Sequence, residues 1–115
     1  IDSLHSHIFV NIYFDICEIE RRKMQALLDT TELNLAQIEE LYEKTNFDVS
    51  MISSKYIFEV SYGKDTAKLA EWNKYVFDNL GIDNVAMFRE YYAKRKIRND
   101  SIIKSGGTIP HNLFE

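Results

Sequence analysis

The chain has 115 residues, 45% of them hydrophobic and 28% charged, with one proline and four glycines. This length and composition are typical of one globular domain and exclude a disordered protein. The net charge of −4 is unevenly spread: residues 1–88 carry eight Lys or Arg against fifteen Asp or Glu, a net −7, and residues 89–115 carry six against three, a net +3. Such an acidic body argues against non-specific nucleic-acid binding, whereas the basic end can contact phosphate or an acidic partner.

The first predicted element is a helix over residues 3–28. Its apolar side chains recur every three or four residues, at Leu4, Ile8, Ile12, Ile16, Ile19 and Leu27. Further apolar rows lie beside this stripe, at Phe9, Tyr13, Cys17, Val10 and Phe14. Apolar residues also alternate over residues 8–16, so a strand there is the alternative, but the absence of turn residues as far as residue 28 favours the helix. Being apolar around most of its circumference, this helix is expected at the centre of a bundle.

A second helix is predicted to begin after Asn34, because Asn34 and Gln37 resemble a capping box. The helical pattern runs through Ile38, Tyr42, Thr45, Val49, Ile52, Tyr56 and Val60. It describes either one helix that ends at Gly63 or two pieces that break at residues 46–48. Residues 56–62 are rich in β-forming side chains, so a short strand there, within an α+β fold, is the alternative.

Two shorter helices complete the predicted fold. Asp65 is placed to cap a third helix that ends at Gly81. Asp83 is placed to cap a fourth, which ends at Gly106 and Gly107 before a proline. Short connections imply antiparallel neighbours, so residues 1–115 are predicted to form a single all-α domain, about a four-helix bundle with the apolar N-terminal helix at its centre.

No catalytic, metal-binding or cofactor-binding signature is found. His5 and His7 have no further His or Cys pair to complete a zinc site and are expected to be exposed. Cys17 is expected to be buried and inert. The carboxylates lack the Glu-x-x-His spacing of a di-metal bundle site and are expected to form a solvated acidic face, at Asp15, Glu18, Glu20, Glu39, Glu40 and Glu43. The basic residues 21–23 are expected to pair within the helix with Glu18 and Glu20.

The lone cysteine and the lack of a signal peptide or a long apolar segment predict a cytoplasmic protein without membrane contact. The first residue is Ile1, which indicates a chain trimmed from a longer one.

The segment that contains residues 89–107 is the strongest candidate for a binding surface. Its basic residues and tyrosines are suited to following a nucleic-acid backbone and stacking on bases. The alternative is a helix whose tyrosines and isoleucines face the core and whose Lys and Arg are solvated. The candidate RNA- or partner-binding residues are Tyr91, Tyr92, Lys94, Arg95, Arg98, Asn99 and Lys104.

Residues 98–107, with the sequence RNDSIIKSGG, resemble the signature region of HEPN domains. The resemblance implies an all-helical, dimeric domain, often a metal-independent ribonuclease, in which Arg98 would stabilise the phosphate and Asn99 would support the geometry. The family places its catalytic histidine near position 103 or 104, where this chain has isoleucine and lysine, and His111 lies beyond the glycines. A HEPN-type protein with this sequence would therefore lack its acid–base group.

The string over residues 106–113, Gly-Gly-Thr-x-Pro-x-x-Leu, is similar to the tail of DNA-damage-inducible protein D and related phage-type proteins. Nothing upstream in the chain extends that similarity.

The functional expectation is a small helical interaction or regulatory module that acts by protein–protein contact or self-association, without chemistry of its own. One alternative is a HEPN-type domain that binds or cleaves RNA. Another is a subunit or fragment of a larger assembly, which the missing Met and the apolar Leu113 and Phe114 would fit.

Overall fold

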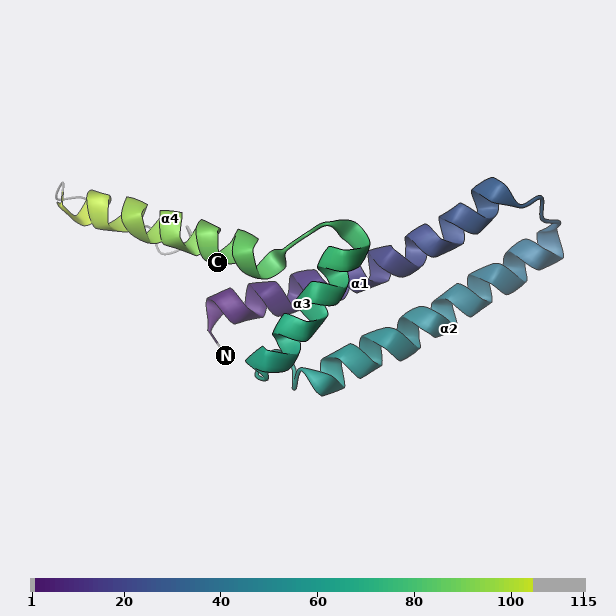
Figure 1. The fold of residues 1–115 in the computed structure, drawn as a ribbon, viewed down its shortest axis with the longest axis horizontal. Coiled ribbons are helices and arrows are strands. Elements are labelled where there is room, and N and C mark those ends of the chain that lie inside the picture. The colour runs from purple at the N-terminus through teal and green to yellow at the C-terminus, as the bar shows by residue number, and fades with distance from the viewer. Residues whose placement is uncertain (1, 105–115) are drawn as a thin grey trace.

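Four helices make up almost all of the described chain. The computed structural model describes the backbone of residues 2–104 and the side chains of residues 2–101. Its helices are α1 (Ser3–Thr30), α2 (Leu35–Glu59), α3 (Thr66–Leu80) and α4 (Asn84–Lys104) (Figure 1). No strand occurs between residues 2 and 104, so the prediction of an all-α, four-helix fold is confirmed. The alternatives of a strand at residues 8–16 or 56–62 are wrong.

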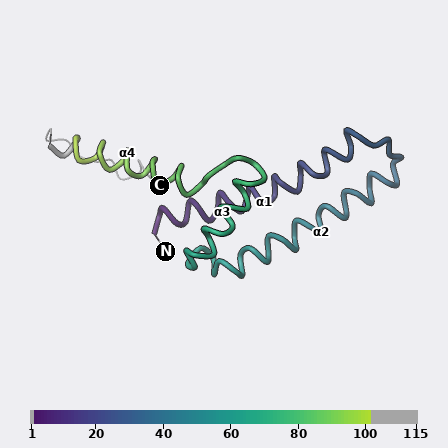
Figure 2. Tube along the Cα trace, in the orientation of Figure 1, coloured from purple at the N-terminus to yellow at the C-terminus, as the bar shows by residue number. Residues whose placement is uncertain are grey.

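The molecule is elongated, 65 Å long and 27 and 24 Å across. Helices α1 and α2 run side by side as an antiparallel hairpin, α3 crosses α1, and α4 extends away from the N-terminal part of α1 (Figures 1 and 2). Because α2, α3 and α4 each pack against α1, the predicted central position of the N-terminal helix is confirmed.

The core is a stripe along one side of α1. Its apolar side chains are buried against residues from α2, the turn after it and α3. The buried apolar set comprises Ile8, Ile12, Ile16, Ile19, Tyr56, Val60, Leu69, Trp72 and Val76. The Tyr56 hydroxyl also donates to the backbone oxygen of Phe9, at 2.7 Å.

The outer side of α1 departs from expectation. Val10 and Phe14 are 48% and 63% exposed, and Leu27, near the C-terminal end of the predicted stripe, is also exposed. The aromatic row that contains Phe9 packs against Tyr56 of α2, whereas Asn11, on another side, contacts the start of α4. Helices thus cover part of the apolar circumference, and the row of Val10 and Phe14 faces outward.

Helix α2 is continuous through residues 46–48. Its N-terminus has the predicted capping box: the Gln37 backbone N–H donates to Asn34 Oδ1 (2.9 Å), and the Asn34 N–H donates to Gln37 Oε1 (3.0 Å). The helix ends at Glu59 rather than at Gly63. Because Ser61, Tyr62 and Gly63 adopt φ angles of 52°, 56° and 94°, the chain leaves the helix through a left-handed turn before the predicted terminator.

The predicted ends of the last two helices are confirmed wherever they fall within residues 2–104. Asp65 accepts a hydrogen bond from the Lys68 backbone N–H, and Gly81 ends α3 with a φ of 73°. Asp83 accepts from the Ala86 N–H at the start of α4. Residues 106 and 107, the predicted terminator of α4, lie outside the described residues.

Candidate interaction surfaces

The first turns of α4 are anchored to α1 through His7. The ring of His7 lies beside Phe88 and Tyr92, with centroids 5.8 and 5.7 Å away, and its Nδ1 is hydrogen-bonded to the Tyr92 hydroxyl. The expectation of an exposed His7 is therefore wrong, because Tyr92, which is 85 residues later in the chain, packs over it. His5 is also half-buried, and it pairs with Asp2 at the N-terminus of α1.

Helix α4 carries most of the predicted binding residues, from Tyr91 next to this anchor as far as Asn99. We call residues 91–99 the basic arm. Four of its side chains line one small hollow: Tyr91, Lys94, Arg95 and Arg98. Tyr91, Lys94 and Arg98 are exposed, whereas Arg95 and Asn99 are half-buried. The side chain of Lys104 lies outside the described residues. Four of the seven predicted residues therefore lie together at one hollow.

Contacts within the helix orient two of these cations. The guanidinium carbon of Arg95 lies 5.1 Å from the centre of the Tyr92 ring, and Lys94 pairs with Glu90 at 2.9 Å. Tyr92 therefore faces inward to His7 and supports Arg95, whereas Tyr91 is exposed.

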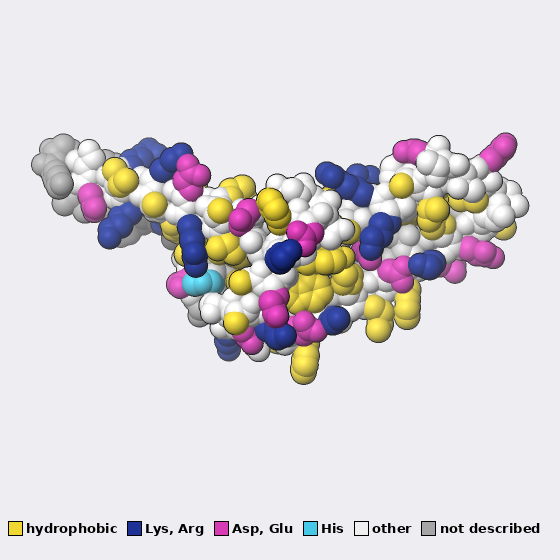
Figure 3. Space-filling view, in the orientation of Figure 1, with side chains coloured by type: hydrophobic (Ala, Val, Ile, Leu, Met, Phe, Trp, Pro, Cys, Tyr) yellow, Lys and Arg dark blue, Asp and Glu magenta, His cyan; other side chains and the backbone are white. Residues whose placement is uncertain are grey.

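A second surface, on α2, was missed by the sequence reasoning. Phe47, Met51 and Phe58 are 64%, 59% and 83% exposed, and together with Ser54 they follow a spacing of four, three and four residues along α2. Such a spacing places them on one helix face. We call this set the outer stripe. Hydrophobic side chains project along the α2 edge of the molecule in Figure 3. The same period is visible in the sequence, but the row predicted to be apolar lies on another face of α2. In that row Tyr56 is buried, whereas Ile38 and Tyr42 are exposed, so the prediction is wrong at the N-terminal end of the row.

A hollow of about 520 Å³ lies at the C-terminal end of the outer stripe. It is lined by Ser54, Ile57, Phe58, Ser61, Tyr62 and Lys64. The left-handed backbone at Ser61 and Tyr62 folds the chain back beside the last turn of α2, so both residues line the hollow.

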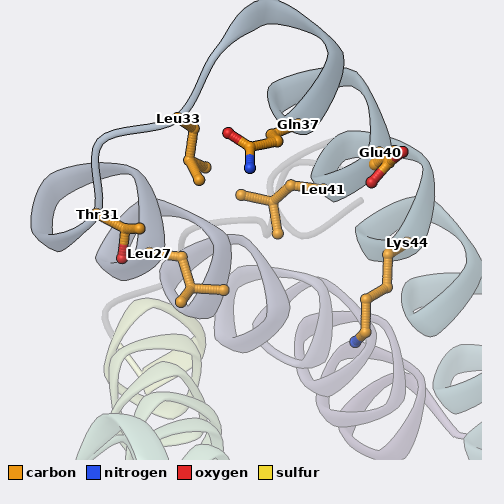
Figure 4. A pocket seen from close by; sticks show the side chains of 7 residues that line it. All are labelled: Leu27, Thr31, Leu33, Gln37, Glu40, Leu41 and Lys44. Carbon is orange, nitrogen blue, oxygen red and sulfur yellow. The ribbon is translucent and has the colours of Figure 1, made fainter.

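A third surface is a groove at the far end of the hairpin, between the end of α1 and the start of α2 (Figure 4). Leucines point into it from both helices and from the loop between them. Its lining consists of Leu27, Thr31, Leu33, Gln37, Glu40, Leu41 and Lys44.

The charges are segregated along the long axis. Lys and Arg side chains are prominent along α4, whereas Asp and Glu are numerous toward the far end of the α1–α2 hairpin (Figure 3). Helix α2 alone carries five carboxylates against two lysines. Glu39, Glu40 and Glu43 are all exposed, as predicted for a solvated acidic face.

The remaining polar candidates have structural partners. Arg21 pairs with Glu18 and Lys23 with Glu20, which confirms intrahelical pairing. Glu20 is buried and Asp15 and Glu18 are half-buried, so the expectation of a solvated face is wrong on α1, because the other helices pack against it. Cys17 is half-buried rather than buried as expected, and this partial burial raises the pKa of its thiol. Among residues 2–101 there is no group of His, Cys, Asp and Glu side chains arranged to hold a metal ion.

No family model, curated protein or solved structure matches the chain. None of the four described helices combines the length and apolar character that crossing a lipid bilayer requires. The function is therefore inferred from the surfaces described above.

Proposed function

We propose that the chain is a helical interaction module that acts by protein–protein contact through the outer stripe of α2. The observation that carries this proposal is the exposure of Phe47, Met51 and Phe58 on one face of one helix. Isolated exposed apolar residues are ordinary, but an aligned set of large ones is typical of a contact surface.

The energetics support a binding role. Fully burying one Phe or Met side chain contributes roughly 1.5–3 kcal/mol. Burying these three partly exposed side chains therefore contributes favourably to a complex and helps to offset the free-energy cost of association. Aromatic and Met side chains are also enriched in the centres of protein interfaces.

A photo-crosslinking experiment tests this role. Benzoylphenylalanine replaces Phe58 in one variant and exposed Lys74 of α3 in a matched control, and both are irradiated as purified protein and in the cells that express the chain. We expect position 58 to form protein adducts, whether with another copy or with another protein, at least about fivefold more than position 74. Equal yields at the two positions would contradict the proposal.

RNA binding by the basic arm is a second candidate, supported by the shared hollow of Tyr91, Lys94, Arg95 and Arg98 and by the HEPN resemblance. An exposed tyrosine beside several cations can stack on a base while the cations contact phosphate.

Fluorescence anisotropy with a labelled single-stranded RNA oligonucleotide tests this second candidate. Arg98→Glu should weaken binding by about tenfold or more at low salt and reduce its salt dependence. Lys74→Glu, on the exposed face of α3, controls for the change in net charge. If the two variants bind RNA with equal affinity, the basic arm is not the binding surface.

A further inference from the structure

We propose that the partner of the outer stripe is α2 of a second copy of this chain, packed antiparallel to the first. This inference rests on the proposed function, that the outer stripe is a protein contact. It adds the identity of the partner, the direction of the two helices and their register.

The hollow beside Phe58 has the form of a hole in knobs-into-holes packing. Three of its lining residues, Ser54, Ile57 and Phe58, stand at positions i, i+3 and i+4 of α2, and Ser61, in the left-handed turn beyond the helix, lines the hollow with them. In packed helix pairs, four residues surround one side chain from the facing helix. The left-handed turn at Ser61 completes the hole just past the end of α2.

Phe47 is the side chain placed to enter this hole. It lies on the same stripe, 64% exposed, about ten residues before the centre of the hole. A two-fold axis near residue 52 places Phe47 of each copy at the hole of the other, so both holes are filled by one symmetric contact. In this register Met51 faces the small Ser54 of the partner copy, which leaves room for its longer side chain.

The charges favour the antiparallel direction. The N-terminal part of α2 carries exposed Glu39, Glu40 and Glu43, whereas the exposed Lys64 lines the hole at the other end. With Phe47 of one copy in the hole of the other, the turn of α2 that carries Glu40 and Glu43 passes beside Lys64, which lines the same hole, twice per dimer. A parallel pair would instead place the three glutamates of both copies side by side, where like charges repel.

A charge-swap experiment with sedimentation equilibrium tests this pairing. We expect a concentration-dependent dimer of the wild-type chain. Glu40→Lys or Lys64→Glu alone should weaken the dimer by about tenfold, and the Glu40→Lys/Lys64→Glu double variant should recover most of the affinity. Glu32→Lys, exposed in the loop between α1 and α2, is the control. Single variants that dimerise like the control, or a double variant that does not recover, would overturn the proposed register.

Substitution in the stripe tests the knob. Phe47→Ala should weaken the dimer by at least about thirtyfold, whereas Phe77→Ala, another exposed phenylalanine on α3, should leave it unchanged. Because both side chains are exposed, neither change should unfold the chain, and circular dichroism verifies this. Equal effects from the two substitutions would overturn the assignment of Phe47.

A distance measurement decides the direction. A nitroxide label is attached to a cysteine introduced by Ala36→Cys, in a chain that also carries Cys17→Ala. Because residue 36 lies about 16 residues from the proposed two-fold axis and a helix rises 1.5 Å per residue, the two labels of an antiparallel dimer should lie about 50 Å apart. A distance under about 20 Å would indicate a parallel pair and overturn the proposal.

A chain that stays monomeric at millimolar concentration, yet crosslinks to another protein through position 58, would overturn the self-association and leave the interaction module standing. Absence of any such crosslink would overturn both.

Discussion

Buried polar side chains tie α1 to the joint between α3 and α4. Asn84, at the first position of α4, is fully buried. Its Nδ2 donates to Asp15 Oδ2 at 2.8 Å, and its Oδ1 accepts from Asn11 Nδ2. A buried amide is tolerated only when its donors and acceptors are paired, so these two α1 residues specify where α4 begins.

Replacing Asn84 by alanine should lower the free energy of unfolding by about 2–3 kcal/mol, because Asn11 and Asp15 would lose their partner in a part-buried site and a small cavity would remain. Asn46→Ala, exposed in the middle of α2, should change it by no more than about 0.5 kcal/mol. Urea denaturation of both variants measures the difference. A loss below about 0.5 kcal/mol at Asn84 would show that the network contributes little.

The start of α4 is held by an aspartate that serves two elements. Asp83 accepts from the Ala86 backbone N–H and from Asn73 Nδ2 of α3, both at 2.9 Å. Asn73 Oδ1 in turn accepts from the Val85 N–H at 3.2 Å. The bond from the Ala86 N–H, together with that from Asn73, lowers the pKa of the Asp83 carboxyl. The same residue therefore caps α4 and joins it to α3.

Asp83→Ala should cost about 1 kcal/mol of stability at pH 7, as is typical for the loss of a helix N-cap. A carboxyl whose pKa is lower in the folded state stabilises fully above its unfolded pKa of about 4, and this contribution is lost as the pH falls through the folded value. The stability difference between wild type and Asp83→Asn should therefore shrink between pH 5 and pH 2. Chemical denaturation across that range measures it, and a difference independent of pH would contradict the charge-dependent role.

At the scale of the whole molecule, α1 is the shared core of an elongated protein. The three other helices pack on it, and its buried isoleucines supply much of the apolar interior. Because α1 contributes to the packing of each of them, we expect the described helices to unfold together rather than one at a time.

Ile12→Ala should lower the free energy of unfolding by about 3–4 kcal/mol, because Ile12 is fully buried and its loss leaves a cavity. Val10→Ala, on the exposed side of the same helix, should change it by no more than about 0.5 kcal/mol. Helical circular dichroism and the fluorescence of Trp72, the only tryptophan, should give coincident transitions. Separate transitions would show that the hairpin and α3 unfold independently.

Helix boundaries were largely predictable from local chemistry. The caps at Asn34, Asp65, Gly81 and Asp83 act on backbone groups within a few residues of themselves, so neighbouring sequence was enough to locate them. The choice between helix and strand at residues 56–62 was not local. There Tyr56 stacks its ring on Phe9 of α1 and donates its hydroxyl to the Phe9 backbone oxygen, contacts that join residues 47 positions apart.

The sequence by itself determined the helical class and the central position of the N-terminal helix, because periodicity and caps operate within one helix and the apolar rows of residues 3–28 cover most of its circumference. Only the tertiary structure decided which apolar rows are covered by other helices. The exposed Phe14 and Phe58 lie on rows whose period in the sequence is the same as that of the buried rows. The same holds for the contact of His7 with Tyr92 and for the hollow beside Phe58. Burial depends on where other helices dock, and docking joins residues that are far apart in the chain.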